Sequence, residues 1–136
     1  MSLVRDAMVS DPGTLATSAS AQDAGEALQR PEVRAVLVVE DDGSFAGVVT
    51  RKTLVREVVA AGRDPVRTPL REVMEPPNFT IESGLELDSG FAFLEEHDLD
   101  RVAVVDEGKL VGVLSRAVVQ RRLAEDEPPP EIEEVR

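Results

Sequence analysis

The sequence has no cysteine, no tryptophan, no tyrosine and a single histidine, His97, among its 136 residues. Without cysteine, neither a disulfide nor a thiolate metal site can form. One histidine leaves little basis for a histidine-rich metal site or a hydrolase triad. We also find no nucleophile with a plausible base and no carboxylate pair that the sequence places together. We therefore expect no catalytic residue, no metal ligand and no required cofactor.

Long apolar runs and an excess of basic residues are also absent. No run approaches the ~20 apolar residues of a membrane-spanning helix, and the first residues lack the apolar stretch of a signal peptide. The formal net charge of −12 argues against nucleic acid and anionic membranes as partners, because phosphate binding needs clustered Lys and Arg. These features favour a soluble cytoplasmic protein.

Apolar residues are nevertheless plentiful. They make up 42% of the chain, whereas aromatic residues make up 3%, so Val, Leu and Ala must build the core. A chain of this length forms one compact domain or two small packed repeats.

The sequence favours two repeats, because one stretch of residues occurs in two similar copies. Residues 45–54 read as a short apolar strand that ends in a hydroxyl and a basic residue and then turns into a helix. Residues 110–119 repeat this pattern 65 positions later. The matched positions are Gly47 with Gly112, Thr50 with Ser115, and Arg51 with Arg116. Duplication of a whole unit is stronger evidence than any single motif.

Each half predicts the order helix, strand, helix, strand, strand, helix. In the first half these elements fall at residues 3–8, 14–17, 20–30, 35–39, 45–49 and 50–62. In the second half they fall at residues 71–74, 80–81, 87–94, 102–105, 110–114 and 116–123. We therefore divide the chain into a first repeat (1–62), a linker (63–69), a second repeat (70–124) and an acidic, proline-rich tail (125–136), which we expect to be disordered.

In order, spacing and duplication, the chain resembles the tandem cystathionine-β-synthase (CBS) domain family, also called the Bateman module, over roughly residues 3–124. The first copy carries the resemblance in Thr14-Leu15, Ser20, Asp23-Ala24, residues 36–43 and residues 47–51. The second copy carries it in Thr80-Ile81, Leu87, residues 102–108 and residues 112–116. The resemblance implies an α/β fold whose two repeats pack about a pseudo-two-fold axis, and it implies a homodimer.

The resemblance also implies ligand clefts between the repeats, where some family members bind adenine nucleotides or related adenosyl compounds. The hydroxyl at the strand-to-helix corner approaches phosphate there, which assigns this role to Thr50 and Ser115. The family's ribose-binding Asp, three residues later, is replaced here by Thr53 and Val118. Independently of the family, a hydroxyl at a helix N-terminus favours an anion.

The remaining candidate ligand-binding residues are Arg51 and Arg116, which would add charge-assisted bonds to phosphate, and Thr14 and Thr80 at the starts of the first strands. Each candidate also has a purely structural interpretation. The corner hydroxyls can be plain helix N-caps, the arginines can be solvated charges, and the two threonines can reflect β-propensity alone. We expect the corner formed by Thr50, Arg51 and Thr53 to be the better ligand site.

Three functional hypotheses follow. The first is a regulatory module that senses a small ligand (AMP, ADP, ATP or S-adenosylmethionine) and signals to an unidentified protein partner. The second is an interaction and dimerisation module without a physiological small ligand. The third, a small enzyme, is disfavoured by the lack of catalytic groups. Phe91 and Phe93 project from different faces of one predicted helix, so we expect one of them to lie in a dimer interface.

Overall fold

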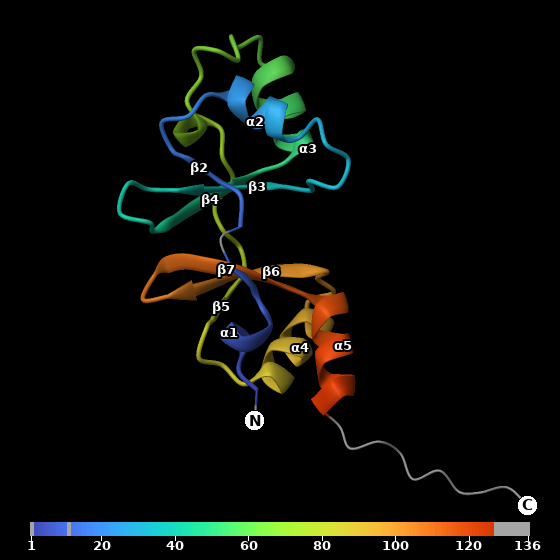
Figure 1. The fold of residues 1–136 in the computed structure, drawn as a ribbon. Coiled ribbons are helices and arrows are strands. Elements are labelled where there is room, and N and C mark those ends of the chain that lie inside the picture. The colour runs from blue at the N-terminus through green and yellow to red at the C-terminus, as the bar shows by residue number, and fades with distance from the viewer. Residues whose placement is uncertain (1, 11, 127–136) are drawn as a thin grey trace, which may run out of the picture.

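The structure, a computed structural model, describes residues 2–10 and 12–126. It contains two units, each with a β-sheet on its inner side and helices on its outer side (Figure 1). The elements of the first half are α1 (Val4–Ala7), β1 (Val9–Ser10), β2 (Thr14–Ala16), α2 (Ala21–Ala27), β3 (Val36–Val39), β4 (Phe45–Val49), α3 (Arg51–Leu54) and the π-helix η1 (Val55–Val59). Those of the second half are the 3₁₀-helix η2 (Leu70–Glu72), β5 (Thr80–Glu82), α4 (Leu87–Glu96), β6 (Arg101–Asp106), β7 (Lys109–Ser115) and α5 (Arg116–Asp126).

The first unit is built on the sheet β2-β3-β4. β2 pairs parallel to β3, and β3 pairs antiparallel to β4. Val36 and Val38 are buried in the core, whereas Leu37 and Val39 on the other face of the strand are partly buried. The helix α2 begins at Ser20, whose hydroxyl accepts a hydrogen bond from the Asp23 amide while the Asp23 carboxylate accepts one from the Ser20 amide. This reciprocal cap is the helix start that the sequence predicts.

The second unit repeats this arrangement with one more strand, in the order β1-β7-β6-β5. β5 pairs parallel to β6 and β6 antiparallel to β7, as in the first unit. The additional strand, β1, pairs antiparallel with β7. It comes from the N-terminal end of the chain and is too short to be recognised in the sequence.

The two units exchange their first segments. We use the term exchanged segments for α1 with the residues after it up to Gly13, and for η2 with the residues after it up to Phe79. α1, at the beginning of the first repeat, packs with the second unit, where Val4 is fully buried in the core. η2, at the beginning of the second repeat, packs with the first unit through Leu70 and Val73. Figure 1 shows α1 beside α4 and α5, far from α2. The packing units in space therefore differ from the repeats as they run in the sequence.

Two glycines allow the exchanged segments to cross the sheets closely. A Cβ built on Gly47 would lie 2.7 Å from the Glu75 carbonyl oxygen and 2.7 Å from the Met74 sulfur. A Cβ on Gly112 would lie 2.7 Å from the Met8 sulfur and equally close to the backbone of the next residue. The same contact therefore occurs in both units, and it explains why the two strands keep a glycine at this position.

The tips of the two β-hairpins join the units directly. The Phe45 amide donates to the Gly108 carbonyl (3.2 Å), and the Leu110 amide donates to the Gly43 carbonyl (3.1 Å). The Lys109 ammonium also donates to the Asp42 carbonyl oxygen. Hydrogen bonds from Ser44, and then the charge of Lys109, lower the pKa of the exposed Asp42 carboxyl. The hairpin tips thus form a polar bridge from one unit to the other.

The fold confirms the predicted class and the tandem arrangement. The expectation that Phe91 and Phe93 cannot both pack against one core is wrong, because both are partly buried against the core of the second unit. The dimer interface expected at one of them stays a prediction. α5 continues to Asp126, two residues into the segment predicted to be a disordered tail. The rest of that segment, residues 127–136, lies outside the described residues. In the described part of the chain, no helix combines the length and apolar character needed to cross a membrane.

The close crossings predict a specific cost for a single methyl group. Gly47→Ala and Gly112→Ala should each lower the free energy of unfolding by about 1–3 kcal/mol, because backbone must move to admit the Cβ. Gly13→Ala is the control, since a Cβ there meets no atom within 4 Å. Urea unfolding measures all three. If the first two variants were as stable as the control, the exchanged segments would not pack as described.

Candidate ligand-binding cleft

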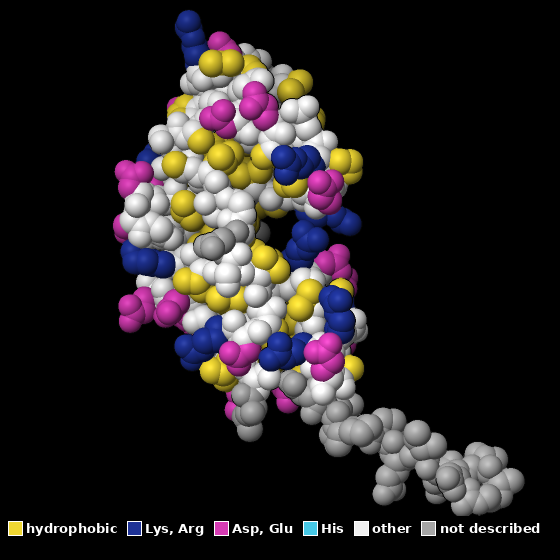
Figure 2. Space-filling view, viewed as in Figure 1, with side chains coloured by type: hydrophobic (Ala, Val, Ile, Leu, Met, Phe, Trp, Pro, Cys, Tyr) yellow, Lys and Arg dark blue, Asp and Glu magenta, His cyan; other side chains and the backbone are white. Residues whose placement is uncertain are grey.

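A cleft of about 710 Å³ lies between the two units. This volume falls within the range usual for small-molecule sites, roughly 300–1,000 Å³. Both units and both exchanged segments contribute to its lining, which comprises Val9, Pro12, Gly13, residues 32–35, Leu37, Phe45, Val48, residues 75–79, Leu99, residues 101–103, Val113, Ser115 and Val118. Figure 2 shows the surface hollowed between the two halves, with Lys or Arg side chains at the edge of the hollow.

Most of the lining is apolar, and its polar groups are few. Arg34 and Arg101 are exposed, and in the described part of the chain neither guanidinium makes a hydrogen bond or an ion pair. Glu75, by contrast, forms an ion pair with Arg56 at 3.0 Å. An apolar cavity with a few charged groups at its edge has the general character of a site for an organic ligand.

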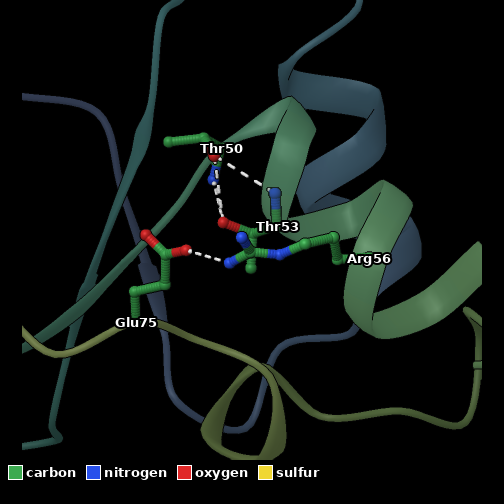
Figure 3. Close-up of polar contacts among 4 residues, drawn as sticks. All are labelled: Thr50, Thr53, Arg56 and Glu75. Atoms are coloured by element: carbon green, nitrogen blue, oxygen red, sulfur yellow. Dashed lines mark hydrogen bonds and ion pairs between the residues drawn. The ribbon is translucent and has the colours of Figure 1, made fainter.

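Thr50 and Thr53 form a reciprocal cap at the start of α3 (Figure 3). The Thr50 hydroxyl accepts a hydrogen bond from the Thr53 amide at 3.2 Å, and the Thr53 hydroxyl accepts one from the Thr50 amide at 3.1 Å. The Thr53 side chain is fully buried. Neither residue is part of the cleft lining, so the geometry of this pair is that of a helix cap.

The segment after η2 packs against β4, next to this corner. The amide and carbonyl of Glu75 form two hydrogen bonds of 2.9 Å with Val48 of β4. Figure 3 shows its side chain reaching toward Arg56, which lies on η1. Glu75 therefore connects an exchanged segment to both the sheet and the helix of the first unit.

Arg51 uses its guanidinium on the backbone of its own unit. It donates to the Leu28 carbonyl at 2.6 Å and to the Arg30 carbonyl at 2.8 Å. Leu28 is the C-cap of α2, where carbonyl oxygens lack partners within the helix. Arg51, at the beginning of α3, thus provides hydrogen-bond donors to carbonyl oxygens at the C-terminal end of α2. Arg51 is not part of the cleft lining.

The second corner differs from the first. Ser115 is partly buried, lines the cleft and accepts a hydrogen bond of 3.4 Å from the Val118 amide. Val118 also lines the cleft. Arg116 lies 3.8 Å from the Glu95 carboxylate and 3.7 Å from the Asp98 carboxylate. Of the two predicted corners, the one at Ser115 is open to the 710 Å³ cleft.

Thr14 and Thr80 begin β2 and β5, as predicted, and both are exposed. They pair in register with Leu37 and Ala103, both of which line the cleft. The threonines themselves are not part of the lining, although their neighbours Gly13 and Phe79 are. Their side chains have no hydrogen bond among the described residues.

Sequence reasoning missed the cleft residues Arg34, Arg101, Phe45 and Phe79. The available signal was an arginine just before the buried strand in each half, at Arg34 and Arg101. An arginine in such a position is usually a solvated charge, so the sequence alone did not distinguish it.

His97 lies at the end of α4. The distance between ring centroids is 4.8 Å from His97 to Phe79 and 4.4 Å from His97 to Phe93. Within the described residues, no group of three or more His, Cys, Asp or Glu side chains could hold a metal ion.

The "CBS domain" family model matches residues 4–60 and 70–125. CBS domain-containing protein YhcV of Bacillus subtilis is 29% identical over 115 residues, which cover 85% of this chain and 81% of that protein. Hypoxic response protein 1 of Mycobacterium tuberculosis is 25% identical over 125 residues, covering 92% and 87%. The crystal structure of CBSX2 in complex with AMP is 25% identical, with a TM-score of 0.74 and coverage of 94% and 100%.

The structural role of Arg51 leads to a prediction about stability. Arg51→Ala should lower the free energy of unfolding by about 1–2 kcal/mol, because two carbonyl groups lose a charged donor. Lys52→Ala is the matched control, because the exposed side chain of this neighbour has no hydrogen bond or ion pair among the described residues. Chemical denaturation compares the two. Equal stability of both variants would show that the two hydrogen bonds contribute nothing measurable.

Proposed function

We propose a regulatory function for this chain, which belongs to the CBS domain family and carries two copies of that domain. In this proposal, a small anionic ligand binds in the cleft between the two units. Its binding changes the relative arrangement of the units, and a protein partner responds to that change. The observation that carries the proposal is the cleft itself, because its lining comes from both units and from both exchanged segments.

The proposed mechanism is a shift between two arrangements of the same packed units. A ligand can shift such an equilibrium only as far as its affinities for the two arrangements differ. A cleft walled by two units meets this condition, since any relative movement changes the distances between its walls. The tips of the two β-hairpins, where the backbones of Ser44 and Lys109 pair, connect the two units at a place distant from the strand-to-helix corners. This connection would limit the relative movement of the units.

Adenine nucleotides and S-adenosylmethionine are the first ligands to test, since CBSX2 was crystallised with AMP. Ser115 is the corner hydroxyl that could approach a phosphate from the cleft wall. We propose regulation rather than catalysis, and a cytoplasmic homodimer as the working form.

A second candidate function is an interaction module without a small ligand. Val55 and Val59 of η1 are 57% and 73% exposed, which is unusual for valine on a helix. Val59 borders a groove of about 410 Å³ between α2 and η1. These exposed side chains favour a protein contact at this face, and such a contact is compatible with either function.

Thermal unfolding with a ligand panel tests the proposed function. AMP, ADP, ATP and S-adenosylmethionine are each added near ~1 mM, because a ligand present at 100 times its dissociation constant stabilises the native state by about 2.7 kcal/mol. A ligand bound in the cleft should raise the midpoint by several degrees. Val118→Asp should increase the shift with AMP, because it restores the carboxylate that the family resemblance assigns to ribose binding. No shift with any compound, in either protein, would favour the interaction module.

A further inference from the structure

We propose that the ligand of this cleft is a small organic anion with a planar apolar body and no sugar, bound through Arg34 and Arg101. This inference rests on the proposed function, which assigns ligand binding to the cleft, and it narrows the chemical class of the ligand. Three observations carry it: two arginines whose side chains have no partner among the described residues, an apolar and partly aromatic wall, and a shortage of groups that could bind sugar hydroxyls.

The two arginines provide the anion site. They come from different units, Arg34 just before β3 and Arg101 at the start of β6, yet both line the same cleft. Neither has a partner among the described residues, although the chain carries a net charge of −12. Other arginines of the described chain, such as Arg121, also lack an acidic partner, but Arg34 and Arg101 line one cleft. A guanidinium binds carboxylate or phosphate through paired hydrogen bonds.

The charges of the lining favour an anion overall. Two carboxylates also line the cleft, Glu32 and Glu75. Glu75 is neutralised by its ion pair with Arg56, whereas Glu32 has no partner in the described part of the chain. Arg34, Arg101 and Glu32 together leave an excess of one positive charge. Glu32 should therefore weaken the binding of an anion.

The apolar wall determines the body of the ligand. Phe45 and Phe79 both line the cleft, although the whole chain has only four phenylalanines. Phe79 is 40% exposed and is supported from behind by Phe93, at 5.9 Å between ring centroids in an edge-to-face arrangement. Such a supported ring offers a contact surface to a planar ligand.

Sugar hydroxyls would find few partners in this cleft. Apart from the charged groups, Asn78 and Ser115 are the polar side chains among the lining residues, and the Ser115 hydroxyl already accepts a bond from the Val118 amide. Glu32 is the carboxylate of the lining that could still accept bonds from a ribose, and its charge opposes an anionic ligand. Sugar hydroxyls that Glu32 does not reach would lie against an apolar wall, where unmade hydrogen bonds weaken binding. This separates the inferred ligand from a nucleotide, which also has a planar ring and an anionic group.

Titration with three probes, followed by amide chemical shifts in NMR spectra, tests the inference. The probes are 2-naphthoate, its uncharged counterpart 2-naphthamide, and AMP. We expect 2-naphthoate to perturb the amides of the lining residues and to bind more tightly than either other probe. Arg34→Gln and Arg101→Gln should each weaken its binding by about 10-fold, which corresponds to the loss of one charge-assisted hydrogen bond.

Two further variants sharpen the test. Glu32→Gln should strengthen 2-naphthoate binding, because it removes the unpaired negative charge. Arg121→Gln should leave it unchanged, since Arg121 is an exposed arginine on α5, outside the cleft lining, with no partner among the described residues. Chemical shifts of each free variant check that the fold is retained.

The outcomes separate the inference from the proposed function. Tighter binding of AMP than of 2-naphthoate at the same residues would overturn the inferred ligand class and leave the proposed function standing. Equal binding of 2-naphthoate and 2-naphthamide, or equal affinity in the arginine variants and the Arg121→Gln control, would overturn recognition by the arginines. If no probe perturbed the lining residues, the proposed function would fail together with the inference.

Discussion

The close crossing of the exchanged segments over Gly47 and Gly112 is the contact on which the rest of the structure depends. Each crossing lets one repeat donate its first segment to the core of the other. Val4, from the first repeat, is fully buried in the second unit, and Leu70, from the second repeat, is fully buried in the first unit. Neither unit has a complete core without the other repeat, so we expect the two repeats to fold and unfold as one cooperative structure.

The same segments also build the cleft. After crossing the sheets, they continue along the cleft as residues 12–13 and 75–79. The chain that holds the units together is therefore also in contact with any ligand that binds between them. In the proposed function, binding would be coupled to the arrangement of the units because the ligand would contact these segments directly.

The two pseudo-equivalent corners have different surroundings in space. At the first corner, Thr53 is buried and bonded to Thr50, and the Arg56 side chain reaches past Thr53 to pair with Glu75 (Figure 3). At the second corner, Ser115 faces the 710 Å³ cleft. The sequence predicts the first corner as the better ligand site, whereas the cleft lining contains Ser115 and Val118 of the second corner and neither Thr50 nor Thr53 of the first.

Much of the fold could be predicted because the sequence repeats it. The Val-rich strands β3 and β6, the cap at Ser20 and the turn at Gly43 follow from local patterns. The exchange of α1 and η2 could not be predicted, because periodicity shows which side chains are apolar and not which core receives them. Phe91 and Phe93 were misjudged for a related reason: the ring of Phe79, distant in sequence, covers Phe93.

The candidate site was harder to predict than the fold. Residue type identified Thr50 and Arg51 as anion-binding groups, whereas the structure gives both of them partners within the protein. Arg34 and Arg101 each come just before a predicted buried strand, which is an ordinary position for a solvated charge. Only three-dimensional packing shows that they share a cleft and that their side chains lack partners among the described residues.

The central claim is that a ligand in the cleft changes how the two units are arranged. The protein has no cysteine, so spin labels on Glu57→Cys and Gln120→Cys would report one distance, from η1 in the first unit to α5 in the second. Double electron–electron resonance should give a shifted distance distribution with saturating 2-naphthoate, or with AMP if 2-naphthoate does not bind. Identical distributions with and without a ligand shown to occupy the cleft would contradict the account.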